Sequence, residues 1–322
     1  MRAAALTACL SLAMAPALAG DFSLGLPIDC EIGTTCRIQQ YVDRDPGPGY
    51  TDFACGRLSY DGHKGTDFAL PTLQDIERGV AVLASADGVV AGRRDGMADT
   101  YYTDAQAEAL DGRDCGNGVL LRHEDGWETQ YCHLRQGSVR VQTGDRVARG
   151  DILGLVGLSG RTQFPHVHLS VRRGGAVIDP FAPDRLEGCG DAGATLWDAE
   201  IATDPGGLIL AGFAPGIPEY DAVRAGEARH DTLPTTAPGL VLFAHAFGGR
   251  DGDRIALRIT DPDGDTVFDD TQVLEKDQAL LFRAGGKRLR GAGWTPGLYT
   301  GTARMTRNGT LLGTRTATVE ID

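Results

Sequence analysis

The sequence has 322 residues, a formal net charge of −13 and 42% hydrophobic residues. This length is enough for two domains with a core each, and the composition is that of a globular protein rather than a disordered one. No stripe of lysine and arginine stands out in this acidic chain, so we do not expect nucleic acid as a partner.

The N-terminal segment, MRAAALTACLSLAMAPALAG, has the features of a secretory signal. Arg2 supplies the positive start, an apolar run follows, and Ala17-Leu18-Ala19 matches the small-residue cleavage pattern. The run is too short to span a bilayer. We therefore predict a signal peptide over residues 1–19, export to the periplasm or the extracellular space, and no membrane span after cleavage. The alternative is a buried N-terminal helix.

Cleavage would remove Cys9 and leave six cysteines, all of them before residue 190. An even number of cysteines in an exported chain predicts disulfides, and Cys30 and Cys36 are close enough for a small local loop. The sequence does not select among the other pairings. A cysteine metal site is disfavoured because no C-x-x-C spacing occurs. The six cysteines are Cys30, Cys36, Cys55, Cys115, Cys132 and Cys189.

Residues 63–180 have the pattern of short alternating strands and tight turns. A cysteine-containing lead over 20–59 precedes them. The stretch "VAVLASADGVVAG" predicts two strands around an Asp-Gly turn, and "GVLLRHEDGWETQYCHL" predicts a hairpin at Asp125-Gly126. A third glycine-punctuated strand pair is "GDRVARGDILGLVG". These patterns favour an antiparallel β-sheet.

Two short helices interrupt the strands. In residues 72–79, Thr72 is expected to cap a helix that ends at Gly79. In residues 103–110, Thr103 and Gln106 form a capping-box pattern. The second helix lies in an insertion over 94–114, between two predicted strands. Such an insertion is either a wall of a substrate cleft or surface structure without a function.

The segment after residue 190 begins a new series of strands, with Asn308-Gly309 as a strong hairpin signal. Strands at this spacing without a helical pattern predict a β-sandwich of the Ig-like kind. We therefore place one domain over 20–190 and a second over 191–322, the alternative being that Trp197 packs back onto the first. His230 and His245 are interpreted as ordinary surface or rim residues.

The stretch "FPHVHLSV" places His166 and His168 two positions apart on an expected strand. Residues i and i+2 of a strand point to one face, so both imidazoles project together. Such a pair suits a metal ion, or one metal ligand beside one acid–base group. The alternative is two structural histidines, and the pair alone does not decide between them.

Two further motifs bear on this choice. In "HKGTD", His63 and Asp67 would lie about 13 Å apart on a straight strand, so we expect a bend at Gly65 to bring them together. An ordinary turn with an Asp hydrogen bond is the alternative. In "YCHL", His133 ends a strand, and alternation predicts Tyr131 and His133 on one face with Cys132 pointing away.

Together the motifs supply four histidines and one aspartate. Catalytic zinc sites commonly use three protein ligands and a water, and imidazole and carboxylate suit zinc. That count leaves two histidines over, which are suitable groups to take a proton from water and to stabilise a developing oxyanion.

The motifs "HKGTD", "YCHL" and "HVH", in this order, resemble those of the lysostaphin/LytM-type zinc endopeptidases, and the resemblance spans about residues 60–180. It implies an antiparallel β-sheet catalytic domain with one zinc ion per chain. By this resemblance His63, Asp67 and His168 would bind the metal, while His133 and His166 would be the catalytic pair.

The resemblance also implies the substrate, peptide bonds in the stems or cross-links of peptidoglycan. Two alternatives are a non-enzymatic LytM-type activator of a cell-wall amidase and a zinc protease that acts on proteins. The activator is disfavoured because such modules have typically lost metal ligands. Two departures from the family pattern, "SGRTQFPHVH" before the H-x-H motif and the 94–114 insertion, would both line the cleft and affect which bond is preferred.

Overall fold

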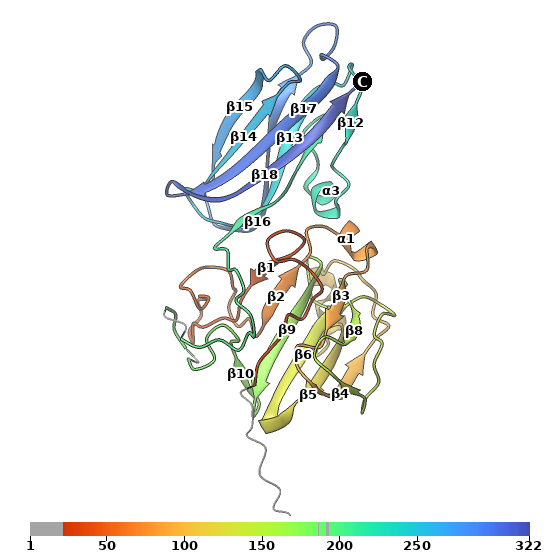
Figure 1. Ribbon diagram of the computed structural model, residues 1–322, viewed down its shortest axis with the longest axis vertical. Coiled ribbons are helices and arrows are strands. Elements are labelled where there is room, and N and C mark those ends of the chain that lie inside the picture. Colours follow the sequence, from red (N-terminus) through yellow and green to blue (C-terminus); the bar gives the residue numbers. More distant parts are fainter. Residues whose placement is uncertain (1–21, 186, 191–192) are drawn as a thin grey trace, which may run out of the picture.

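The computed structural model describes residues 22–185, 187–190 and 193–322, so the predicted signal peptide over 1–19 lies outside the described residues. The described chain is mainly β, as predicted, and forms two units stacked end to end (Figure 1). The N-terminal unit contains β1 to β10, and the C-terminal unit contains β11 to β18. Within the described residues, no helix is long and apolar enough to cross a membrane.

The N-terminal unit is built on one large antiparallel sheet in the order β1-β2-β9-β6-β5-β4-β7, with β10 paired to β9. The central strands β2, β9 and β6 carry the three histidine motifs. A separate pair, β3-β8, packs beside this sheet. The strands are β1 (Arg37–Gln40), β2 (Thr66–Ala69), β3 (Ala81–Leu83), β4 (Gly88–Arg94), β5 (Asn117–Arg122), β6 (Trp127–Leu134), β7 (Arg146–Val147), β8 (Ile152–Leu155), β9 (His166–Arg173) and β10 (Ala176–Ile178).

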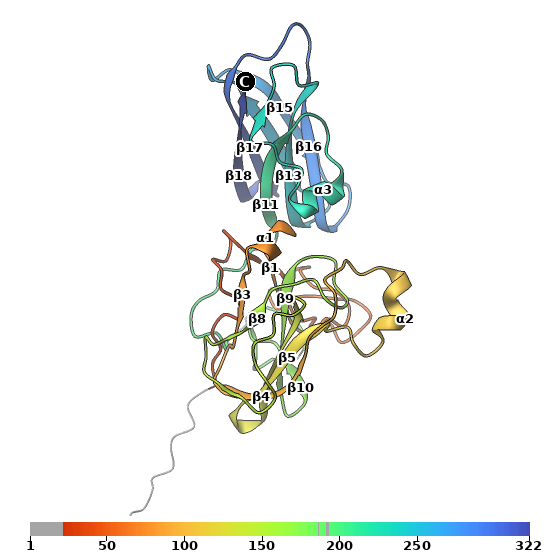
Figure 2. The ribbon, with the colours of Figure 1, turned by 90° about the vertical axis from the view of Figure 1, so that its right-hand side faces the viewer.

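The short helices lie where the sequence predicts them, with one difference at a cap. α1 (Gln74–Glu77) has Leu73 rather than Thr72 as its N-cap, because the Thr72 hydroxyl instead donates to Asp75. η1 (Asp104–Gln106) begins with the predicted capping box and continues into α2 (Ala107–Leu110), which protrudes from the side of the unit (Figure 2). η2 (Glu124–Gly126) forms the predicted hairpin turn between β5 and β6.

The C-terminal unit consists of two sheets, β11-β13-β16 and β12-β18-β17-β14-β15, which enclose a shared apolar core. This arrangement is the predicted two-sheet architecture, whereas its Ig-like classification stays a prediction. Asn308 and Gly309 both have positive φ and form the predicted β17–β18 turn. The elements are β11 (Gly207–Ala214), α3 (Tyr220–Ala225), β12 (Thr232–Leu233), β13 (Gly239–Gly249), β14 (Arg254–Thr260), β15 (Thr266–Val273), β16 (Gln278–Arg288), β17 (Gly297–Arg307) and β18 (Thr310–Ile321).

The core of the N-terminal unit includes residues from beyond the predicted boundary at 190. Trp197 is 6% exposed and packs edge-on against Phe68, while its backbone bridges to Leu24. Ile209 and Phe247, from the C-terminal unit, belong to the same apolar cluster. The boundary itself stays a prediction, but this packing joins the two units through their cores.

The six cysteines after residue 21 form three disulfides, which agrees with the prediction that most are paired: Cys30–Cys36, Cys55–Cys189 and Cys115–Cys132. The first is the expected local loop. The second fixes the end of the N-terminal unit to its lead, because it joins residues 134 positions apart. The prediction for the C-terminal histidines is correct for His230, which is exposed, and wrong for His245, which is 2% exposed.

Candidate active site

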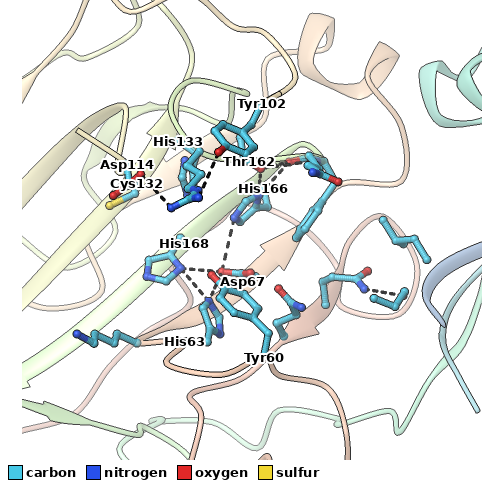
Figure 3. A pocket seen from close by; sticks show the side chains of 18 of the residues that line it. Tyr60, His63, Asp67, Tyr102, Asp114, Cys132, His133, Thr162, His166 and His168 are labelled. Atoms are coloured by element: carbon cyan, nitrogen blue, oxygen red, sulfur yellow. Dashed lines mark hydrogen bonds and ion pairs between the residues drawn. The ribbon is translucent and has the colours of Figure 1, made fainter. Parts of the chain in front are cut away.

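A cleft of about 1130 Å³ lies over the central strands of the large sheet and contains all five residues that the motifs single out. Figure 3 shows His63, His166 and His168 grouped around the Asp67 carboxylate, with His133 beside His166. All except His168 are almost fully buried. The sequence therefore identified side chains that the fold brings to one point.

His63, Asp67 and His168 converge through the pairing of two neighbouring strands. Asp67 on β2 lies directly opposite His168 on β9, and the chain bends at Gly65 so that His63 reaches the same point. A Cβ at Gly65 would lie 2.5 Å from Nε2 of His168 and 2.6 Å from the Leu169 carbonyl oxygen. Glycine is required there because the backbone passes directly over the imidazole.

The distances between the three polar atoms fit a metal ion. Oδ1 of Asp67 lies 2.8 Å from Nδ1 of His168 and 3.2 Å from Nε2 of His63, and the two nitrogens are 3.1 Å apart. Ligand bonds of about 2.0–2.2 Å in a tetrahedron place ligand atoms about 3.3–3.6 Å apart. These side chains thus form a group that could hold a metal ion with only a small adjustment.

Backbone carbonyls fix the orientation of three of the four imidazoles. A carbonyl only accepts, so Nδ1–H of His63 donates to Tyr41, that of His133 to Ser159 and that of His166 to Phe164. In its neutral form each of these rings therefore keeps the lone pair of its Nε2 directed at the cleft. Such supporting contacts select the tautomer that a metal ligand or a base needs.

His63, Asp67 and His168 are called the metal-type group below. His133 and His166 lie side by side at one end of this group. Their ring centroids are 4.6 Å apart, and Nε2 of His166 is 3.5 Å from Oδ1 of Asp67. Phe164 stacks on the other side of His166 at 4.3 Å between centroids. This packing holds the His166 ring in one plane facing the cleft.

The predicted facing of Cys132 is wrong. Cys132 pairs with His168 across the β6–β9 ladder and lines the cleft, whereas the buried Tyr131 points into the core and its hydroxyl accepts from the Ser85 amide. His133 has a φ of 64°, a left-handed conformation that interrupts the strand's alternation. This local twist brings His133 to the cleft beside Cys132.

A buried loop holds the Ser159 carbonyl in place for His133. The Ser159 hydroxyl accepts from the Asn117 amide at 2.9 Å and donates to the Leu134 carbonyl at 2.7 Å. Gly116, with a φ of 62°, allows this approach, since a Cβ there would lie 2.4 Å from the Ser159 carbonyl oxygen. The Cys115–Cys132 disulfide braces the same region on its other side.

Burial and charge perturb the pKa values in this group. Burial alone would raise the pKa of the Asp67 carboxyl, but His63, His166 and His168 hold it well below its usual range. Burial acts against protonation of His63, yet the Asp67 charge outweighs it and raises the pKa. Burial lowers the pKa of His133 well below its ordinary value and that of His166 to about 4. The last two rings are therefore neutral near pH 7.

Sequence reasoning missed other residues that line the cleft. The 94–114 insertion contributes Tyr102 and Asp114, and the segment before the H-x-H motif contributes Arg161, so both departures from the family pattern do line the cleft. The C-terminal unit adds α3 and the turn between β15 and β16. The one sequence signal that could have pointed to this lining is lysine content, because the chain has only three lysines and two of them, Lys64 and Lys276, line the cleft.

The fold and site thus define a cleft in an antiparallel sheet where a group of His and Asp side chains could hold a metal ion beside a pair of neutral histidines. Residues 61–180 match the family model described as Peptidase family M23. This segment is a peptidase M23 domain of the LytM type, which confirms the resemblance drawn from the three motifs.

Curated relatives match about a third of the chain. DD-carboxypeptidase/endopeptidase Mpg of Neisseria meningitidis serogroup B is 35% identical over 122 residues, which are 37% of this chain and 22% of that protein. Peptidoglycan DD-endopeptidase ShyA of Vibrio cholerae serotype O1 is 35% identical over 106 residues, which are 33% of this chain and 19% of that protein. The chain therefore spans about a fifth of the length of these relatives.

Among solved structures, a variant of the catalytic domain of the prophage-encoded M23 protein EnpA from Enterococcus faecalis is similar to this chain. It is 26% identical, with a TM-score of 0.30, over 48% of this chain and 90% of that one.

Proposed function

We propose that this protein is an exported, zinc-dependent endopeptidase that hydrolyses peptide bonds in the stems or cross-links of peptidoglycan. The observation that carries the proposal is the convergence of His63, Asp67 and His168 beside His133 and His166 in one cleft of an M23 domain. The relative ShyA is named a peptidoglycan DD-endopeptidase, which supports the same substrate and a location outside the cytoplasm.

In this proposal His63, Asp67 and His168 hold the zinc ion through Nε2, Oδ1 and Nδ1. The donor set of two imidazoles and one carboxylate is typical of catalytic zinc, which keeps a further position open. When bound, the ion supplies Lewis-acid chemistry, polarising the attacking water and the scissile carbonyl. The Gly65 bend and the Tyr41 carbonyl keep the His63 ring in its ligand orientation.

His133 and His166 form the acid–base pair of the proposal. Each is neutral near pH 7 and presents an unprotonated Nε2, so each can accept a proton as water attacks the peptide carbonyl. After taking that proton, the imidazolium donates a hydrogen bond to the developing oxyanion or a proton to the leaving amine. The proposal assigns these tasks to the pair without dividing them.

A non-enzymatic activator of an amidase is not favoured, since all five motif residues are present and lie in one cleft. Mass spectrometry of purified peptidoglycan after digestion tests the proposal and identifies the bond that is cut. New amine and carboxyl ends within stem peptides are expected with the wild-type protein and not with His166→Ala. Digestion of casein without digestion of cell walls would instead favour a protease of proteins, and release of stem peptides only with an added amidase would favour the activator.

A further inference from the structure

The charge of the cleft is opposite to that of the protein. The chain has a net charge of −13, yet five basic side chains line the cleft against three aspartates, one of which is Asp67 in the metal-type group. Low-dielectric walls of one charge sign concentrate counter-charged ligands in a cleft. The basic residues are Lys64, Arg161, Arg172, Arg224 and Lys276, and the other two acids are Asp114 and Asp277.

The two lysines differ from the arginines in having no protein partner. Arg161 lies 3.8 Å from Asp114, Arg172 donates to Gln130, and Arg224 donates to Asp221. Among the described residues, Lys64 and Lys276 have no ion pair or hydrogen bond and both are exposed. The chain has only three lysines in all, so two of the three are free ammonium groups at this cleft.

Lys276 belongs to the C-terminal unit but is held at the cleft by contacts between the units. The buried Gln39 on β1 donates to the Ala279 carbonyl, three residues from Lys276, at 3.1 Å. The Arg224 guanidinium on α3 lies 4.2 Å from the centroid of the Tyr101 ring in the insertion. The backbone carbonyl of Arg224 also accepts a hydrogen bond from the Leu73 amide. The C-terminal unit is thus fixed as a wall of the cleft rather than tethered beside it.

From these observations we propose that the cleft selects an anionic stem peptide, with Lys276 of the C-terminal unit and Lys64 of the N-terminal unit binding its free carboxylate groups. This inference rests on the proposed function and names the charge class of its substrate. Stem peptides suit this cleft because they are linear and carry free carboxylates, which an ammonium group binds through charge-assisted hydrogen bonds. It also assigns the C-terminal unit to substrate selection.

The test uses the full mature protein and two synthetic stem peptides that differ only at one terminus, a free carboxylate or a primary amide. Wild type is expected to have a kcat/KM about threefold to tenfold higher for the free acid, mainly through KM, as for one partly exposed charge pair. The preference should decline as ionic strength rises. Lys276→Gln should lower the ratio, and Lys276→Glu should lower it further, while Lys64 retains part of the preference.

Lys287→Gln is the matched control, because Lys287 is the third lysine, is exposed on β16, the strand that follows Lys276, and does not line the cleft. It should retain the wild-type ratio. Equal kcat/KM for the two peptides with wild type, or an unchanged ratio in Lys276→Gln and Lys276→Glu, would overturn the inference while leaving the proposed function intact. Cleavage of neither peptide, nor of whole peptidoglycan, would overturn the proposed function itself.

Discussion

Replacing Trp197 by Ala tests whether the N-terminal unit extends past residue 190. Trp197 is 6% exposed, with ring centroids 5.8 Å from Phe68 and 5.5 Å from Phe181. Removing a buried Trp side chain from such a site costs about 3–5 kcal/mol of the free energy of unfolding. Activity should fall as well, because Phe68 directly follows Asp67 and its support is lost.

Denaturant unfolding of the mature protein, followed by circular dichroism and by loss of peptidoglycan digestion, measures this effect. Trp294→Ala is the control, since Trp294 packs against the C-terminal core and donates to the Ala237 carbonyl. It should destabilise the C-terminal unit and change the site less. A loss below about 1 kcal/mol for Trp197→Ala would refute the reasoning that this residue closes the N-terminal core.

The same packing predicts how fragments behave. A fragment over 20–190 lacks Leu196 and Trp197, which are both buried, and also Ile209 and Phe247 of the same cluster. We expect it to unfold at a lower denaturant concentration than a fragment that ends at residue 202. If the two fragments are equally stable and equally active on soluble muropeptides, the boundary belongs at 190 as the sequence suggested.

Three further predictions concern the site and the pH response. Elemental analysis of the wild type should find roughly one zinc ion per chain, and Asp67→Ala should lose it. Full zinc occupancy in this variant would contradict the ligand assignment. His133→Ala and His166→Ala should retain zinc but lose about 10²–10⁴-fold in activity, and near wild-type digestion by either would remove it from the acid–base pair. Burial lowers the pKa of His245 to about 3, so only the unfolded chain takes up this proton between about pH 6.5 and pH 3. Stability is therefore lost as pH falls through that window, by about 1.4 kcal/mol per unit from this group, and the slope in His245→Asn should be smaller by that amount.

The parts of the site that the sequence predicts are those set by local geometry. Two-residue periodicity places His166 and His168 on one face. Gly65, directly before β2, allows the bend that brings His63 to Asp67. The turns at Asp125-Gly126 and Asn308-Gly309 follow from residues that adopt positive φ readily. None of these inferences needs a contact with a distant segment.

Where the sequence interpretation fails, a single residue departs from the regular pattern. Alternation placed Cys132 away from the site, but the positive φ of His133 interrupts the alternation there. A non-glycine residue adopts this conformation at a cost, so the surrounding contacts must hold it. The Ser159 carbonyl, which accepts from Nδ1–H of His133, and the Cys115–Cys132 disulfide are such contacts.

The remaining features arise from segments far apart in the chain. Lys276 reaches the cleft because Gln39, more than 200 positions earlier, anchors the start of β16. Propensity and periodicity are properties of neighbouring residues, so neither could predict this approach. Composition carries the missing information: when a chain this acidic has only three lysines, their positions are informative, and two of them face the same cleft from different units. The C-terminal wall of the cleft is a product of how the two units pack, so under the proposed role of Lys276 selectivity should change when that packing is altered even if every motif residue is kept.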